Sequence, residues 1–515
     1  MERAVELGWL TRDMVARQAE RRPDALAISD LASGRRLNFA ELDDLVRRAD
    51  GWLRGCGLPS GARVAILARN GLHHAALFYG CPRADTVFLP LNWRLSGHEL
   101  GGLLEDARPD VLIYEAEFGA EAELALSIAP TPRVLRIAPD GDDLAEALSA
   151  ARPTPPRPMD PQAPALILYT SGTTGRPKGV VITTSSAFYG ALNFTFVGEL
   201  TAGHAMLCDT PLFHVVGTLA ILHASMIAGA AVHLSDRFMP GDTLARFADP
   251  QLAISHYFCV PQMAQALAQH PDFATTNLTG LRLFTGGAPM PQALSVTLLD
   301  RGVVASNGYG MSENGTVIGV PLDPEIARRK LGSVGVPSPI MEVRLVGPDG
   351  RDVAEGETGE IWLRSPAVTP GYWNQPEINA AAFSDGWFRT GDAARRDTDG
   401  FYFIVDRWKD MYITGGENVY PAEVEAVLLD LKGVADAAVV GFADPRWGES
   451  GCAFLCLDGA ADIDAQAVLA WCGERLAGYK KPRLVRFIDA LPRTASGKVR
   501  KDVLRQGIEV ESAGS

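Results

Sequence analysis

The run ALILYTSGTTGRPKGVVI at residues 165–182 decides how this chain folds. Its first residues are apolar and predict a buried strand, and the residues from 179 onward predict a second one. Glycines in the connecting loop let the backbone turn sharply and bring N–H groups against phosphate oxygens, while hydroxyl groups add donors and a lysine adds charge. The loop therefore predicts a phosphate site formed by Thr170, Ser171, Gly172, Thr173, Thr174, Gly175 and Lys178.

Two alternative interpretations of this loop are weaker. An arbitrary glycine-rich loop is more often a flexible turn, but the flanking strands and the lysine favour phosphate binding. A kinase or GTPase loop needs Gly-Lys-Ser/Thr at the start of a helix. Here Pro177 precedes Lys178 and Gly179 follows it, so that pattern fails.

Alternating strand and helix patterns surround the loop on both sides. From residue 37 to 115, helical periodicity over 39–53 is followed by a strand pattern from 63 and by further alternation. A second alternating block runs from 165 to about 320. Such alternation predicts parallel sheets with helices on their faces. The proline-rich stretch 152–164 between the blocks predicts an extended connector.

The rest of the chain changes character twice. The glycine-rich segment 332–402 has strand patterns and predicts a small β-barrel or meander, and a mixed pattern of helices and strands follows residue 406. A chain of 515 residues is too long for one core. We expect an α/β fold with a large N-terminal domain, 1–406, made of two βαβ-type subdomains and the β-barrel. A small mobile α+β C-terminal domain, 407–515, completes it.

Composition excludes several classes of protein. Hydrophobic residues make up 47% and charged residues 21%, as in soluble globular proteins. No apolar run approaches the length of a membrane span, and the acidic start does not resemble a secretory signal. Seven dispersed cysteines favour a reducing compartment, so a cytoplasmic location is expected; Cys452 and Cys456 fit one buried face of a strand. The net charge of −14 disfavours nucleic acid as a partner.

Further motifs follow the phosphate loop in a fixed order. They are GGAP at 286–289, NGYGMSE at 307–313, FRTGD at 388–392, DRWKD at 406–410, MYITGGENVYPAE at 411–423 and LPRTASGK at 491–498. Together with the phosphate loop they strongly resemble the adenylate-forming superfamily, which contains acyl-CoA synthetases, adenylation domains of peptide synthetases and beetle luciferases. The resemblance covers nearly the whole chain.

The resemblance implies roles for the motif residues in nucleotide binding. Tyr309 would lie against adenine, Ser312 would bind phosphate or the acyl carboxylate, and Glu313 would ligate Mg²⁺. Asp392 would hold the ribose hydroxyls with support from Arg407, since a carboxylate can accept two hydrogen bonds from a diol. The implied nucleotide site also includes Gly287, Ala288, Asn307, Gly308, Gly310 and Met311.

The C-terminal motifs imply two faces of one small domain. Lys498 would be the lysine of the adenylation step, and Lys409 would be the hinge between the domains. Gly415, Gly416 and Glu417 would flank the tunnel for the pantetheine arm of coenzyme A. The family often has Thr-His and an asparagine after the phosphate loop, whereas TTSS stands here at 183–186, which weakens any expectation for that helix start.

The run PLFHVVGT at 211–218 resembles the segment that walls the acyl site in acyl-CoA synthetases. His214 would lie near the carboxylate entrance, although a lone histidine in an apolar run is more often a core residue. Peptide-synthetase domains place an aspartate hereabouts for the substrate amine, and none stands between 213 and 223. Small and apolar residues favour a fatty or aromatic acid: Val216, Gly217, Ala220, Gly287 and Ala288.

The function implied is an ATP-dependent acyl-CoA synthetase that uses Mg²⁺, a carboxylic acid and coenzyme A. The main alternative is a stand-alone adenylation enzyme that loads an acyl group onto a carrier protein. A luciferase-like oxygenase and a non-catalytic nucleotide-binding relative are weaker alternatives. The sequence leaves the oligomeric state open, a homodimer included.

Overall fold

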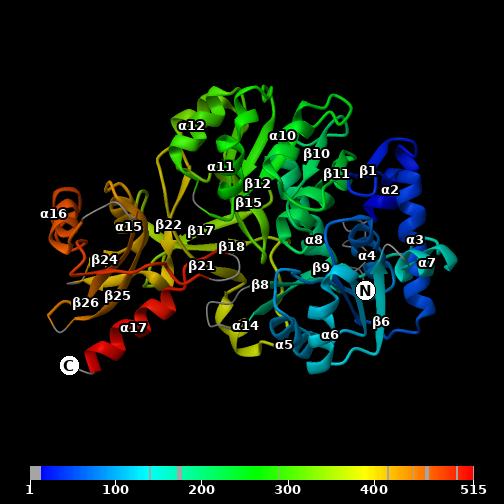
Figure 1. Cartoon of the computed structure of the whole chain (residues 1–515), viewed down its shortest axis with the longest axis horizontal. Helices are drawn as coiled ribbons and strands as arrows, with labels where there is room; N and C mark the ends of the chain where they lie inside the picture. The colour runs from blue at the N-terminus through cyan, green and yellow to red at the C-terminus, as the bar shows by residue number, and fades with distance from the viewer. Residues whose placement is uncertain are drawn as a thin grey trace. The chain divides into compact units, whose positions relative to one another are not determined.

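The computed structural model describes residues 13–138, 141–170, 177–288, 290–414, 417–444, 446–458, 463–493 and 497–513. These residues form two compact units. The first contains 13–170, 177–342 and 364–388, and the second contains 343–363 and 389–513, with the gaps just given. Figure 1 labels the elements along the chain.

The first unit contains two mainly parallel sheets. The eight-stranded sheet has the order β19-β9-β8-β4-β3-β5-β6-β7. Its strands are β3 (Arg63–Leu67), β4 (Val87–Pro90), β5 (Val111–Glu115), β6 (Arg133–Ala138), β7 (Gly141–Asp142), β8 (Pro164–Thr170), β9 (Lys178–Thr183) and β19 (Gly371–Tyr372). The nine-stranded sheet has the order β16-β15-β14-β13-β12-β10-β11-β1-β2. Its strands are β1 (Leu26–Asp30), β2 (Arg36–Asn38), β10 (Ala205–Cys208), β11 (Ala231–Leu234), β12 (His256–Cys259), β13 (Arg282–Thr285), β14 (Val304–Met311), β15 (Gly315–Gly319) and β16 (Val336–Pro337).

Helices cover both sheets, as the alternating pattern predicts. One apolar core joins both sheets through α3 (Phe39–Gly55), α4 (Leu72–Arg83), α8 (Thr184–Val197), the π-helix η2 (Val216–His223) and α9 (Ala224–Ala228). A second core joins the eight-stranded sheet to α5 (Gly97–Ala107) and α6 (Gly119–Ile128). A third joins the nine-stranded sheet to α10 (Pro240–Ala248), α11 (Pro261–Gln269) and α12 (Gln292–Asp300). The unit also contains α2 (Met14–Arg21), η1 (Ala116–Phe118), α7 (Asp143–Ala150), η3 (Pro271–Ala274), α13 (Pro324–Arg329) and α14 (Pro376–Ala382).

Local sequence signals explain where two of these helices start. In α3, Asn38 and Glu41 form a capping box, and buried apolar side chains recur every three to four residues. At α8, Thr183 and Ser186 form the same box, so the unusual TTSS segment still starts a helix. In the predicted connector 152–164, residues 152–163 contain neither helix nor strand, and Pro164 is the first residue of β8.

The segment predicted as a small β-barrel or meander forms a five-stranded sheet. Its strands are β17 (Glu342–Val346), β18 (Thr358–Arg364), β20 (Phe383–Ser384), β21 (Trp387–Arg396) and β22 (Tyr402–Arg407). Strand β21 pairs antiparallel with both β20 and β22, as in a meander.

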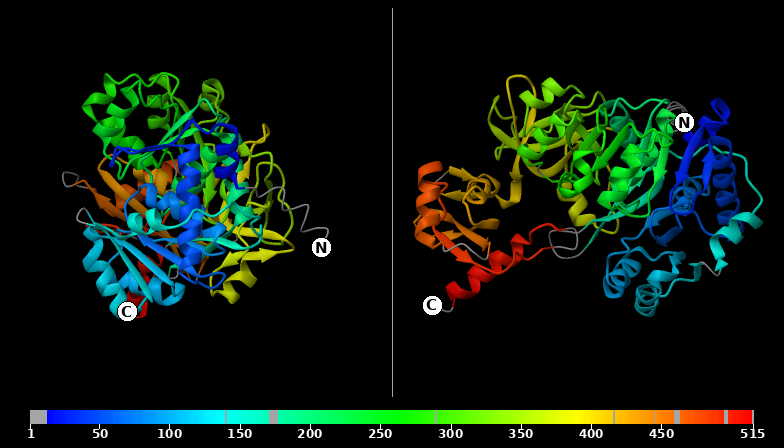
Figure 2. Two further views of the ribbon diagram at one scale, coloured as in Figure 1. Left: turned by 90° about the vertical axis from the view of Figure 1, so that its right-hand side faces the viewer. Right: turned by 45° about the horizontal axis from the view of Figure 1, so that its top comes forward.

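The C-terminal part of the second unit is a sheet with helices on both faces (Figure 2). Its strands are β23 (Tyr412–Thr414), β24 (Glu417–Val419), β25 (Val434–Asp444), β26 (Gly448–Leu457) and β27 (Leu484–Phe487). Helices α15 (Pro421–Leu429) and α16 (Ala465–Arg475) pack on one face and α17 (Lys501–Ala513) on the other. Cys452 and Cys456 share the buried face of β26 that meets α17, which confirms that interpretation of their spacing. The short η4 (Trp408–Asp410) follows β22.

No helix in the described part of the chain is long and apolar enough to span a bilayer. None of the seven cysteines, all of which lie in the described part of the chain, forms a disulfide.

Candidate functional site

The phosphate loop is held at both ends by a pair of strands. Strands β8 and β9 pair antiparallel, and Thr170 lies opposite Lys178, whose carbonyl accepts a 3.4 Å hydrogen bond from the Thr170 hydroxyl. At Gly179 a Cβ atom would lie 2.9 Å from the Ile167 side chain, so only glycine allows this strand contact. Residues 171–176 lie outside the described residues, and with them the predictions for Ser171, Gly172, Thr173, Thr174 and Gly175.

The NGYGMSE motif lies on a tight hairpin. Strand β14 contains Asn307 to Met311 and returns antiparallel as β15, and Ser312 and Glu313 occupy the turn between them. At Gly310 a Cβ atom would lie 2.1 Å from the Gly315 carbonyl oxygen, so the two strands approach too closely for a side chain. Tyr309 is buried, whereas Ser312 and Glu313 are half-buried at the turn.

Tyr372, which the sequence did not single out, joins two predicted site residues. Its hydroxyl donates a 2.8 Å hydrogen bond to Oε1 of Glu313. Its ring lies under Lys178, whose Nζ is 5.5 Å from the ring centroid. The structure therefore brings the phosphate-loop lysine and the predicted Mg²⁺ ligand to opposite parts of one tyrosine. The cluster combines a hard carboxylate oxygen with a cation, which suits a magnesium-bound polyphosphate.

The glycine turn GGAP starts at the carboxyl end of β13, beside the NGYGMSE strand. Strands β13 and β14 are parallel, and Thr285 lies opposite Asn307. Gly287 has a φ of +81°, a conformation that favours glycine, and it is exposed with Ala288 half-buried after it. Ligands of open α/β sheets bind outside the carboxyl ends of the strands, where these residues lie.

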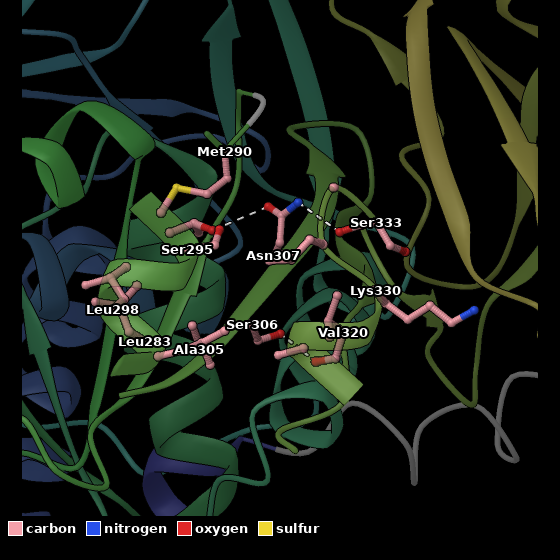
Figure 3. Close-up of a pocket in the computed structure, with 15 residues that line it drawn as sticks. Leu283, Met290, Ser295, Leu298, Ala305, Ser306, Asn307, Val320, Lys330 and Ser333 are labelled. Atoms are coloured by element: carbon pink, nitrogen blue, oxygen red, sulfur yellow. Dashed lines mark hydrogen bonds between the residues drawn. The ribbon is translucent and has the colours of Figure 1, made fainter. Parts of the chain in front are cut away.

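A small pocket lies behind Asn307, between β13, β14 and α12 (Figure 3). The Asn307 amide donates to the Ser333 carbonyl oxygen at 3.0 Å, and its own oxygen accepts from the Thr285 hydroxyl at 3.3 Å. The remaining wall is mainly apolar, with Leu283, Leu298, Ala305 and Val320 among its residues. The Asn307 amide is thus oriented at both ends by its neighbours.

His214 is an exposed residue on a turn that follows the carboxyl end of β10, so the core-histidine alternative is wrong. Its ring lies 4.5 Å, centroid to centroid, from the ring of buried Phe213. Of the residues expected to form the acyl wall, Gly217 and Ala220 are buried in η2, and Val216 is half-buried. A π-helix such as η2 is rare and occurs frequently at functional sites.

The turn that leads to His214 is held by Asn70, a residue that the sequence did not indicate. Buried Asn70 donates from Nδ2 to the carbonyls of Thr210 and Ser235, both at 3.0 Å. Its Oδ1 accepts from the Leu212 N–H at 2.8 Å. From the other side, a Cβ atom on Gly217 would lie 2.4 Å from the Pro211 carbonyl oxygen, so η2 packs directly against the turn.

Phe213 lies beside Trp93, and two arginines lie over the Trp93 ring. Trp93 meets Phe213 edge-on, with centroids 6.2 Å apart, and the guanidinium groups of Arg69 and Arg94 lie 4.7 and 4.2 Å from the Trp93 centroid. Arg69 also forms an ion pair with Glu117. Burial lowers the pKa of Arg94, and the nearby Arg69 charge lowers it further. Of the two arginines over Trp93, Arg69 is thus paired with a carboxylate.

In the second unit, Asp392 and Arg407 face each other across β21 and β22. They are register partners, and Arg407 Nε lies 3.0 Å from Asp392 Oδ1. Asp392 is 7% exposed, and its N–H donates to the Thr390 hydroxyl at 3.1 Å. The structure thus pairs the two residues that the resemblance assigns to one ribose.

Lys498 is exposed in a short hairpin of the second unit. Arg493 bridges to Val499, and the Arg500 N–H donates to the Pro492 carbonyl at 2.7 Å. The Arg493 guanidinium also donates to the Gly497 carbonyl at 2.6 Å, next to the lysine. The backbone around Lys498 is therefore fixed by contacts on both sides of the residues that the structure leaves undescribed, 494–496.

Two more of the predicted residues, Lys409 and Glu417, lie at or shortly before the C-terminal sheet. Glu417 lies on β24, whereas Gly415 and Gly416 lie outside the described residues. Lys409 lies in η4, directly after β22. Asp406, at the end of β22, accepts from the Ala422 N–H at 2.7 Å at the start of α15. Among the described residues, no cluster of three or more His, Cys, Asp or Glu side chains could hold a metal ion.

Comparison with protein families gives two matches in the order of the domains. Residues 15–373 match the model described as AMP-binding enzyme, and residues 423–498 match that of the AMP-binding enzyme C-terminal domain. The first match alone spans more than half of the chain.

Curated relatives are similar over almost their whole length. Feruloyl-CoA synthase of Amycolatopsis sp is 41% identical, over 95% of this chain and 97% of the relative. Indoleacetate–CoA ligase of Aromatoleum aromaticum is 38% identical, over 92% and 93%. Long-chain-fatty-acid–CoA ligase FadD13 of Mycobacterium tuberculosis is 34% identical, over 97% and 98%.

Solved structures agree with the fold. ATP-bound MatB from Rhodopseudomonas palustris superposes with a TM-score of 0.85 at 30% identity, over 96% of this chain and 98% of that one. O-succinylbenzoate coenzyme A synthetase from Bacillus subtilis, in complex with ATP and magnesium ion, gives 0.83 at 31% identity, over 95% and 98%.

Proposed function

Because this chain belongs to the AMP-binding enzyme family, we propose that it is an ATP-dependent acyl-CoA synthetase. An acid carboxylate oxygen attacks the α-phosphorus of ATP, and the bond to pyrophosphate breaks. The thiolate sulfur of coenzyme A then attacks the acyl carbon of the adenylate, and AMP leaves. Three relatives with CoA-ligase names support coenzyme A as acceptor, so the carrier-protein alternative is not favoured.

Lys178 and Glu313 form the centre of the proposed phosphate site, and their meeting at Tyr372 is the observation that carries the proposal. The chemical problem is to bring the negatively charged carboxylate of the acid against the negatively charged triphosphate of ATP. Lys178 offsets phosphate charge, and the Glu313 carboxylate would hold Mg²⁺, which neutralises developing charge on the phosphates when bound. A single protein carboxylate suits Mg²⁺, since this ion usually keeps water and phosphate oxygens as its other ligands. Ser312, beside Glu313, would donate to phosphate or carboxylate.

Asn307, Tyr309 and the Gly287–Ala288 turn form the proposed adenine side of the site. Ser333 and Thr285 orient the side-chain amide of Asn307. A group that hydrogen-bonds a base needs such a fixed orientation. Tyr309 adds a flat apolar surface. We assign the wider nucleotide site to Thr170–Lys178, Gly308, Gly310 and Met311, with Asp392 and Arg407 for the ribose.

The proposed small domain begins at residue 407. Its proposed functional residues are Lys498, Lys409 and the 415–417 loop. Lys498 would bridge carboxylate and ribose oxygens as charge moves towards pyrophosphate. Gly415, Gly416 and Glu417 would flank the pantetheine arm of coenzyme A. Rotation of the small domain at Lys409 would bring either Lys498 or the 415–417 loop to the reacting groups. Residue 407 falls within 374–422, the stretch that the two family models leave between them.

The proposed acid is aromatic or fatty. Two relatives at 41% and 38% identity are named for feruloyl and indoleacetate, and one at 34% for a long-chain fatty acid. Phe213 and the residues of η2 give the turn at His214 an apolar side, which an aromatic ring or alkyl chain could cover. We place His214 near the carboxylate entrance and assign it no proton transfer.

The test is acid-dependent pyrophosphate release with ATP and Mg²⁺. Hydroxycinnamic, indole-acetic, benzoic and C6–C18 fatty acids are compared, each with and without coenzyme A. We expect release with at least one aromatic or fatty acid, and an acyl-CoA product only when coenzyme A is present. Protein that releases no pyrophosphate with any of these acids contradicts the proposal.

A further inference from the structure

We propose that Tyr372 is a positioning residue of the nucleotide site, which holds the Glu313 carboxylate in the orientation needed for Mg²⁺ and offers its ring face to Lys178. The inference rests on the proposed function and extends it to a residue outside the predicted motifs. Tyr372 lies on β19, a two-residue strand at the edge of the eight-stranded sheet.

The side chain of Tyr372 contacts both charged groups through different parts. The hydroxyl donates to Glu313 Oε1 at 2.8 Å, and the ring face lies 5.5 Å from Lys178 Nζ. A hydrogen bond to a carboxylate oxygen is directional and restrains the orientation of the group, whereas a cation over an aromatic face is attracted by the ring quadrupole. Removal of the Tyr372 hydroxyl alone therefore abolishes the contact with Glu313 and leaves the contact with Lys178.

The backbone of Tyr372 is itself held on both sides. The Asn379 side chain accepts from the Tyr372 N–H at 2.6 Å and donates to its carbonyl at 2.9 Å. Strand β19 pairs antiparallel with β9, where Tyr372 lies opposite Val180, two residues from Lys178. The Trp373 N–H donates to the Gly179 carbonyl at 2.7 Å. The tyrosine is thus fixed to the strand that carries the lysine.

The same segment also holds the backbone of Glu313. The Thr369 N–H donates to the Glu313 carbonyl at 2.6 Å, and the Thr369 hydroxyl donates to the Val181 carbonyl at 2.6 Å. Residues 369–373 therefore contact β9 and the Glu313 turn at both backbone and side-chain level. This arrangement fits a segment that connects the Lys178 strand to the Glu313 turn better than it fits an isolated surface tyrosine.

Loss of a partner that orients a metal ligand typically lowers metal affinity 10- to 100-fold. Because Glu313 keeps its backbone contact to Thr369, we expect the lower end of this range for Tyr372→Phe, about tenfold. The phenylalanine ring keeps the contact with Lys178. In Tyr372→Leu both contacts are lost, so binding should weaken at every Mg²⁺ concentration.

The experiment measures binding of a non-hydrolysable ATP analogue to the full chain by titration calorimetry over a series of Mg²⁺ concentrations. For Tyr372→Phe we expect half-maximal binding to need about tenfold more Mg²⁺ than wild type, with affinity recovered at saturating Mg²⁺. Tyr114→Phe changes a half-buried tyrosine at the end of β5 in the same way, and should leave the Mg²⁺ requirement unchanged. Thermal unfolding of each variant is recorded in parallel.

An unchanged Mg²⁺ requirement in Tyr372→Phe overturns the inference, whatever the change in thermal stability, because a purely structural tyrosine would lower stability alone. If that variant does not fold, Asn379→Ala takes its place, since it loosens Tyr372 without removing the hydroxyl, and a raised Mg²⁺ requirement is again expected. Wild-type protein that binds no analogue with Mg²⁺ would instead contradict the proposed function.

Discussion

Replacing Asn70 with alanine should damage the acid site more than the nucleotide site. The Asn70 amide makes three hydrogen bonds to backbone groups that are far away in sequence, two to carbonyls and one from an N–H. Alanine leaves all three groups buried without this partner. The turn between Thr210 and Leu212 then loses its contact with the chain between β3 and α4, and Phe213 and His214 follow that turn.

The magnitude follows from the cost of unsatisfied buried groups. Each orphaned backbone donor or acceptor costs about 1–3 kcal/mol, and a water that enters the vacated space recovers part of it. For three groups we expect a loss of about 3–5 kcal/mol in the free energy of unfolding. This is a large part of the roughly 5–15 kcal/mol that stabilises a typical domain.

The assay combines urea unfolding with steady-state kinetics. Asn70→Ala should lower the unfolding free energy by the stated amount and raise KM for the acid at least fivefold, with KM for ATP within about twofold of wild type. Asn277→Ala is the matched control, because Asn277 is exposed and accepts only one local bond, from the Thr279 N–H. A loss under about 1 kcal/mol, or equal rises in both KM values, would refute the reasoning.

Three further predictions concern catalysis and pH. Lys498→Ala should reduce adenylate formation by a factor on the order of a hundred or more while thioester formation from supplied adenylate stays largely intact, measured as two half-reactions; equal losses would refute its role. Lys409→Pro should slow the thioester step more than adenylation, in the same half-reactions, and unchanged thioester kinetics would contradict the hinge. Burial lowers the pKa of His74 to about 3 and those of His223 and His256 to about 4, so the folded state binds fewer protons than the unfolded state, in which histidine has a pKa of about 6.5. Stability should therefore fall as pH drops from about 6.5 towards 4, by about 2 kcal/mol per histidine at pH 5, and a urea midpoint that stays constant from pH 7.5 to 5 would show that these rings are not buried neutral.

The order of elements was predictable wherever a local period or cap determines it. The periodicity over 39–53 predicted α3, and Asn38 and Glu41 cap that helix. The apolar run at 165–169 predicted β8, and the alternating blocks predicted parallel sheets with helices on their faces. The signal that specifies these elements is a local period of 3.6 residues in a helix and two in a strand, so the sequence alone is enough to indicate them. The identity of the motifs depends likewise on short, contiguous runs.

The contacts that arrange the site depend on residues far apart in the chain. Tyr372 meets Glu313 across 59 positions, and Asn70 meets Ser235 across 165. His214 has an apolar neighbourhood in sequence, yet the turn after β10 exposes it. The runs GYW around Tyr372 and RNG around Asn70 contain no local pattern that indicates a hydrogen-bond partner. The partners come into contact only when the sheets and the strand ends pack together. The sequence by itself determined the chemistry of the motifs and the order of the elements, whereas tertiary packing decided which side chains hold the reactive groups in place.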